Sequence, residues 1–194
     1  MDAAPLYWDP TPVIRHTAGT VPGILGWSGT LPALHEYRGQ WAERNWRNVP
    51  GPIYAAATDT CWASHMWAPH HITYENETGQ EFLFRQPRSQ LELLGVLCGA
   101  AADPFGAWAV DGDEHWTPEL VRIWWRDRSR LAEWMRTNVN AWAESPRSDE
   151  REAATGITEY AAYLEHGLED QLRAYLFWQE ERRPPAAHER LPTL

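Results

Sequence analysis

The chain has 194 residues, of which 43% are hydrophobic and 23% charged, and 27 acidic against 17 basic residues give it a net charge of −10. Every basic residue is an arginine, which excludes the lysine chemistry of a Walker A loop or a Schiff base, and the acidity disfavours nucleic acid as a partner. Two cysteines are too few for a disulfide scaffold, and no apolar run is long enough for a membrane span or a standard secretory signal, so we expect a cytoplasmic protein without a membrane partner.

Proline and glycine recur throughout residues 1–30, which predicts an irregular N-terminal arm. Aromatic residues such as Tyr7 are expected to hold the arm on the core, because rings of this size bury a large apolar area. After the arm, Thr30 is a good N-cap residue and Pro32 suits a first helical turn, so the sequence predicts a helix that runs to about Trp46.

Short strands are expected in the middle of the chain. Residues 72–75 and 81–85 alternate in hydrophobicity around the turn Asn-Glu-Thr-Gly at 76–79, which predicts a β-hairpin. Residues 53–57 and 107–110 are further candidates for short strands. The predicted sheet is therefore small and antiparallel.

Helices dominate the second half of the chain. The capping box Ser-Gln-Leu-Glu opens a helix over 89–101, and helical periodicity predicts two long helices over 117–144 and 149–183. We therefore expect an α+β fold that is mostly helical, with two long C-terminal helices. The arm would precede a single globular domain at 31–185, and a polar tail would follow at 186–194.

One cluster has the residue types of a metal site. Cys61, His65, His70 and His71 follow a Cys-x3-His-x4-His spacing, and thiolate and imidazole are the ligands that zinc prefers. The alternative is a histidine-rich loop packed over the core, because the spacing matches no known zinc signature. No other cofactor is expected.

A second cluster suits acid–base chemistry. Asp111, Asp113 and His115 lie just before a predicted helix, where active-site residues are common. The alternative is a solvated turn whose acids favour the helix dipole. Asp127 projects onto the apolar stripe of its predicted helix, where a buried carboxylate would act as an acid or base, or would pair with an arginine.

Two features suggest binding. The stretch 144–170 holds eight acidic residues and two arginines, which is typical of a solvated helix face and would also suit a basic protein partner. The 13 tryptophans exceed what a core of this size needs, which leaves some for a ligand pocket or an interface. The candidate binding residues are Trp62, Trp67, Trp108, Trp116, Trp124, Glu159 and His166.

Short strings spread over the chain carry a resemblance. They are NVPGPIY, TDTCW, EFLFRQPRS, DPFG, DGDEHWTPELV and YLFWQEERRPP. Over residues 46–185 the chain resembles an uncharacterised, tryptophan-rich group of actinobacterial proteins, some of which are labelled ferredoxin. The resemblance implies no activity that can be transferred. Two cysteines cannot hold an iron–sulfur cluster without other ligands, so the label does not suit this chain.

The sequence leaves two functional hypotheses. The first is a non-enzymatic binding protein, either an acidic inhibitor or immunity-type protein for a basic partner, or a small-molecule binder with an aromatic pocket. The second is a small enzyme that uses histidine with Asp59, Asp111 or Asp113 in acid–base or metal-assisted chemistry. Convergence of His65, His70 or His71 with His115 around one concave pocket would favour the enzyme.

Overall fold

The fold is α+β and mostly helical, as the sequence predicts. The structure is a computed structural model, and it describes residues 7–23, 26–58, 61–75 and 77–194. The described residues form seven α-helices, two 3-10 helices and four short strands. In chain order they are α1 Thr11–Thr17, η1 Leu34–Glu36, η2 Trp41–Glu43, β1 Tyr54–Ala55, β2 Ile72–Tyr74, β3 Glu81–Leu83, α2 Gln90–Ala102, β4 Trp108–Ala109, α3 Gly112–His115, α4 Pro118–Arg126, α5 Arg128–Ala143, α6 Ser148–Glu165 and α7 Leu168–Glu181.

The strands form two antiparallel pairs. The predicted hairpin is confirmed as β2 and β3, with Thr73 opposite Phe82. The other pair joins β1 to β4, so that Ala55 lies opposite Trp108. The sequence predicts both of these strands but gives no sign that they pair, because about fifty residues separate them.

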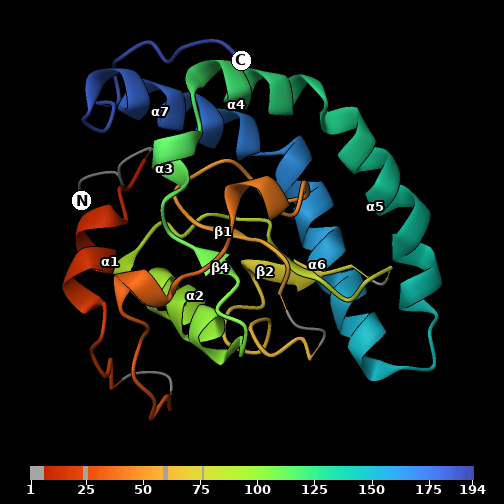
Figure 1. Ribbon diagram of the computed structural model, residues 1–194. Coiled ribbons are helices and arrows are strands. Elements are labelled where there is room, and N and C mark those ends of the chain that lie inside the picture. Colours follow the sequence, from red (N-terminus) through yellow and green to blue (C-terminus); the bar gives the residue numbers. More distant parts are fainter. Residues whose placement is uncertain (1–6, 24–25, 59–60, 76) are drawn as a thin grey trace.

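Two clusters of buried side chains hold the elements together. The larger lies between helices α4–α7 and the β2–β3 hairpin, where α5 packs along α6 and α4 packs on α7. The smaller surrounds α2 and includes β1 and β4. Figure 1 shows α4 and α5 as an outer arc, with α6 and α7 on its inner side.

A buried asparagine links β1 to β3. Asn48 donates from Nδ2 to the carbonyl groups of Asn45 and Ala55, at 2.6 and 2.8 Å. Its Oδ1 accepts from the backbone N–H groups of Ala55 and Leu83, at 3.1 and 2.9 Å. One side chain thus bonds four backbone groups, and it supplies the acceptor for the buried N–H groups of Ala55 and Leu83.

The helix predicted between Thr30 and Trp46 is wrong, since only η1 and η2 form there. The backbone N–H groups of Arg38 and Gly39 instead donate to Gly106 and Trp108, at 2.7 and 3.1 Å. A Cβ atom on Gly39 would lie 2.5 Å from the carbonyl oxygen of Ala107, so only glycine fits this approach. Hydrogen bonds to a distant segment therefore override the local helical signals.

The two long C-terminal helices are also corrected, because each is broken into two. The first breaks at Asp127, which ends α4 and precedes α5. The second breaks at Gly167, whose φ of 119° lies outside the range of a helix. Each break lets the chain turn, so that α5 packs on α6 while α4 packs on α7.

The segments expected to be irregular are attached to the core. Residues 11–17 form α1, and the ring of Tyr7 packs on those of Tyr175 and Trp178. Near the other end, Arg173 donates to the carbonyl group of Pro192 at 2.8 Å. None of the helices in the described part of the chain has the length and apolar character needed to cross a membrane.

Candidate functional site

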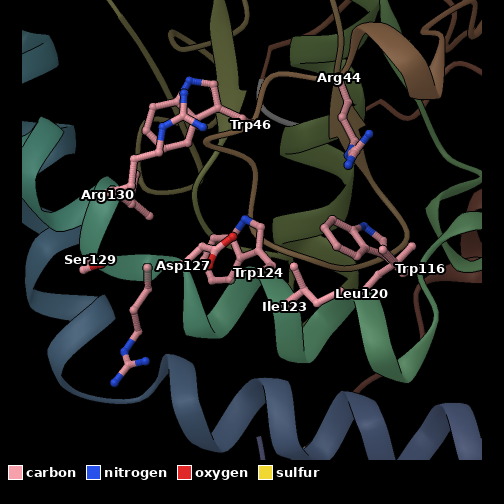
Figure 2. A pocket seen from close by; sticks show the side chains of 11 residues that line it. Arg44, Trp46, Trp116, Leu120, Ile123, Trp124, Asp127, Ser129 and Arg130 are labelled. Carbon is pink, nitrogen blue, oxygen red and sulfur yellow. The ribbon is translucent and has the colours of Figure 1, made fainter.

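A pocket of about 340 Å³ lies beside the break between α4 and α5, facing the segment after η2. Figure 2 shows it from close by. We call it the tryptophan–arginine pocket. Its lining consists of Arg44, Trp46, Trp116, Leu120, Ile123, Trp124, Asp127, Arg128, Ser129, Arg130 and Leu131.

Arg44 is held beside this pocket by an aromatic ring. Its guanidinium carbon lies 3.9 Å from the ring centre of Trp41, and its Nη1 donates to the Trp41 carbonyl at 3.0 Å. Burial lowers the pKa of the Arg44 guanidinium, which means that the charged form is less favourable there than in water. Among the described residues, no carboxylate lies within ion-pair distance of Arg44.

Arg130 enters the same pocket from the start of α5. Its guanidinium carbon lies 4.0 Å from the ring centre of Trp46, and Arg47 lies 4.7 Å from the same ring. Figure 2 shows the Arg130 guanidinium against the Trp46 ring. Arg47 has an ion pair with Glu77 at 3.7 Å, whereas Arg130 has none among the residues that the structure describes.

Hydrogen-bond donors outnumber acceptors in the pocket. The indole N–H of Trp116 is buried and has no acceptor within the described part of the chain. Among the described residues, three arginines and one acidic residue, Asp127, line the pocket. The remaining floor is apolar and includes Ile123 and Trp124. The arrangement suits a ligand with an anionic group and a flat apolar part.

Asp127 does not lie in the apolar stripe, contrary to the sequence prediction. Its side chain is exposed, its N–H donates to Ile123 at 3.0 Å and its carbonyl accepts from Arg130 at 3.0 Å. The prediction fails because it assumes one continuous helix, whereas the break at this residue changes the direction in which the side chain points.

Two of the predicted acid–base residues lie close together, outside the lining of the pocket. His115 Nε2 lies 3.3 Å from Asp111 Oδ2, and the His115 ring stacks on Trp41 with centres 4.9 Å apart. The hydroxyl of Tyr54 faces Asp111, and burial followed by this carboxylate raises the pKa of Tyr54. The arrangement has the groups of a proton relay, but none of the three lines the tryptophan–arginine pocket.

Asp113 points away from His115 and toward α7 and α1. It accepts from the hydroxyl of Tyr175 at 2.6 Å and from that of Thr11 at 3.4 Å. Burial raises the pKa of the Asp113 carboxyl to about 6, although the hydrogen bond from Tyr175 opposes the rise. Its contacts join three elements, which indicates a structural role.

The predicted metal ligands do not converge. His65 donates from Nδ1 to the carbonyl of Ile72 at 2.6 Å, and His71 donates from Nδ1 to that of Arg85 at 3.0 Å. His70 lies 3.0 Å from Glu159, while Cys61 is exposed. Among the described residues, no three histidine, cysteine or acidic side chains come together as a metal site. Asp59 lies outside the described residues.

Of the five tryptophans predicted to bind a ligand or partner, two line the tryptophan–arginine pocket and three lie elsewhere. Trp108 is fully buried and donates to Ser64 at 3.2 Å, so it belongs to the core. Trp62 stacks on Tyr74 with centres 4.1 Å apart, and Trp67 meets Trp27 edge to face. Only the remaining two, Trp116 and Trp124, line the tryptophan–arginine pocket.

The acidic row is interrupted and partly paired. Glu159 faces His70, and Asp149 has an ion pair with Arg147 at 2.6 Å. His166 is exposed at the end of α6, and the break at Gly167 separates it from the acids of α7. The basic protein partner stays a prediction.

Sequence reasoning missed Arg44, Trp46 and Arg130. The available signal was the mixture of arginine and tryptophan in the strings Arg-Asn-Trp-Arg at 44–47 and Trp-Trp-Arg-Asp-Arg-Ser-Arg at 124–130. In an acidic chain, such local groups of arginine beside aromatic rings favour an anion site.

Comparison of the chain with protein-family models, curated proteins and solved structures finds no match. The resemblance to the tryptophan-rich actinobacterial group therefore stays a prediction. The grounds for a function are the geometry and charge of the site.

Proposed function

We propose that the protein is a binding protein for a small organic anion, which occupies the tryptophan–arginine pocket. The observation that carries the proposal is a pair of guanidinium groups, those of Arg44 and Arg130, each stacked on a tryptophan and without an ion pair among the described residues. Both border an apolar floor that would receive the uncharged part of the ligand.

The charges support an anionic ligand. A guanidinium group that is partly removed from water and lacks a counter-ion raises the free energy of the folded protein. Burial lowers the pKa of Arg44, so an anion in the pocket would offset an existing cost.

The size and lining of the pocket support an aromatic or planar ligand. A volume of about 340 Å³ lies near the lower end of the range of about 300–1,000 Å³ for small-molecule sites, which suits one or two rings. Trp46, Trp116 and Trp124 offer surfaces on which such rings stack.

The lining favours binding over catalysis. Neither histidine nor cysteine lines the tryptophan–arginine pocket, and the pair formed by His115 and Asp111 lies outside it. His70 and His71 line one further cavity, and His65 and His70 line another, but His115 lines neither of them. An enzyme that combines them around one substrate therefore has less support than a ligand carrier.

The test is calorimetric titration with two probes of the same shape, naphthalene-2-carboxylate and the neutral naphthalene-2-carboxamide. The carboxylate is expected to bind saturably to the wild-type protein, and the carboxamide about tenfold more weakly, because it lacks the charge–charge hydrogen bonds. Arg130→Met keeps an apolar side chain of similar length and is expected to weaken the carboxylate by about tenfold.

The matched control is Arg126→Met, since Arg126 is exposed on α4 and does not line the pocket. It is expected to bind the carboxylate like the wild type. Absence of saturable carboxylate binding would contradict the proposal. Equal affinity for the two probes, or an equal loss in Arg126→Met and Arg130→Met, would contradict it as well.

A further inference from the structure

A second cavity, of about 630 Å³, lies where the segment before β2, the start of α2 and the end of α6 meet. It shares no residue with the tryptophan–arginine pocket. We call it the histidine–arginine pocket. The side chains that could recognise a ligand there are His71, Arg85, Arg88, Glu92, Tyr163 and His166.

Arg85 is the central residue of this cavity. Its guanidinium carbon lies 4.7 Å from the ring centre of Tyr163 and 5.8 Å from that of Phe84. Its Nε is buried and has no hydrogen-bond partner within the described part of the chain. Buried polar groups in folded proteins are nearly always paired, so the guanidinium of Arg85, which also has no ion pair among the described residues, would gain from an acceptor in the cavity that this residue lines.

The surroundings add positive charge and few acceptors. Arg88 is exposed, and neither it nor Arg85 has an ion pair among the described residues. Within the described part of the chain, Glu92 is the one acidic residue of the lining, and its Oε2 already accepts from the backbone N–H of Arg88 at 2.6 Å. His71 is held by its bond to the Arg85 carbonyl, which leaves Nε2 3.9 Å from Glu92.

We propose that the histidine–arginine pocket binds the phosphate group of a small, non-aromatic molecule. The planar fork of Arg85 matches two oxygens of a phosphate, and Arg88 would supply a second cation. The cavity is larger than a single phosphate group, and Trp67 and the 60% exposed Leu91 line it, so they would contact the rest of the molecule. Nothing in this proposal depends on the ligand of the tryptophan–arginine pocket.

The test is calorimetric titration of the full chain with inorganic phosphate and with glycerol 3-phosphate, which has no ring. Both are expected to bind at one site, glycerol 3-phosphate more tightly, because its carbon chain would reach the apolar part of the lining. Arg85→Met and Arg88→Ala are each expected to weaken both probes about tenfold. Arg88 is exposed, so its variant decides the test if circular dichroism shows that Arg85→Met does not fold.

Two control variants show whether phosphate binds in this pocket or elsewhere on the protein. Arg15→Ala removes an exposed arginine of α1 that lines neither pocket, and its affinity is expected to equal that of the wild type. Arg130→Met alters the tryptophan–arginine pocket and is likewise expected to leave phosphate binding unchanged. Absence of binding by both probes would overturn the proposal. So would wild-type affinity in Arg88→Ala, or a loss in Arg130→Met as large as that in Arg88→Ala.

Discussion

Replacement of Asp113 by asparagine is expected to stabilise the protein at neutral pH. The carboxyl group lies between Tyr175 and Thr11, and burial raises its pKa from 3.8 to about 6. An asparagine has nearly the same shape, and its Oδ1 can still accept from the Tyr175 hydroxyl. The variant therefore removes the cost of holding a charge in a partly buried position and keeps the main hydrogen bond.

The magnitude follows from the shift in pKa. A rise from 3.8 to about 6 corresponds to about 3 kcal/mol, at about 1.4 kcal/mol per pH unit. Because Asp113 is partly exposed, solvent screening reduces the expected gain to about 1–2 kcal/mol. For a chain of this length, each kcal/mol changes the melting temperature by about 2–4 °C.

The sign of the pH dependence is opposite to that of a carboxylate whose pKa is lowered by an ion pair. Between pH 3.8 and about 6 the folded state holds the Asp113 proton while the unfolded state has lost it. The free energy of unfolding of the wild-type protein therefore decreases as the pH rises from 3.8 to about 6. Above pH 6 the charged carboxylate of Asp113 destabilises the folded state to its full extent. The advantage of Asp113→Asn should grow from small at pH 4 to its full value at pH 7.

Urea unfolding of the two proteins between pH 4 and pH 8 measures this difference and cancels the other titrating groups. Tyr175→Phe supplies a second readout, because the hydrogen bond from Tyr175 lowers the pKa of Asp113. Loss of this hydrogen bond should raise the pKa of Asp113 further in the protein that carries the aspartate. The Asp113→Asn variant has no carboxyl group to titrate, so Tyr175→Phe should not change its pH dependence in this way. A difference that is constant with pH, or a variant that is less stable throughout, would refute the reasoning.

Two further variants test the packing that positions the sites. Asn48→Ala removes the acceptor of the buried backbone N–H groups of Ala55 and Leu83 and is expected to lower the free energy of unfolding by about 3 kcal/mol or more. Asn140→Ala on the exposed face of α5 should change it little, and urea unfolding measures both variants. Gly112→Ala would place a Cβ 2.2 Å from the carbonyl oxygen of Gly51, and should cost about 2 kcal/mol or more in the same assay, against a small effect for the exposed Glu114→Ala. A wild-type stability for either test variant would contradict the contact on which it depends.

Local signals were sufficient where neighbours along the chain decide the structure. Ser89 caps α2 by accepting from the Glu92 N–H at 3.3 Å, and Thr117 caps α4 by accepting from Leu120 at 3.3 Å, as their positions in the sequence predict. The hairpin of β2 and β3 also formed as predicted. Capping and tight turns involve residues three to five positions apart, so the sequence contains the whole interaction.

The sequence predicts only part of the candidate site, because the residues that line it come from segments that are far apart along the chain. Trp116 and Trp124 were candidates because tryptophans are conspicuous in composition, but Arg44 and Arg130 were not. These arginines become a pair only when the segment after η2 lies against the break between α4 and α5. Nothing in the chain near Arg44 indicates that Arg130, far away in the sequence, faces the same pocket.

The sequence by itself determined the fold class, the hairpin, the caps of α2 and α4 and the exclusion of lysine chemistry, because composition and short-range hydrogen bonds depend on the residues alone. Only the tertiary structure decided that the segment around Gly39 is not a helix, that the long helices break at Asp127 and Gly167, and which charged groups meet. Each of these depends on contacts between distant segments, whose hydrogen bonds and buried area outweigh local preferences of about 1 kcal/mol or less per residue.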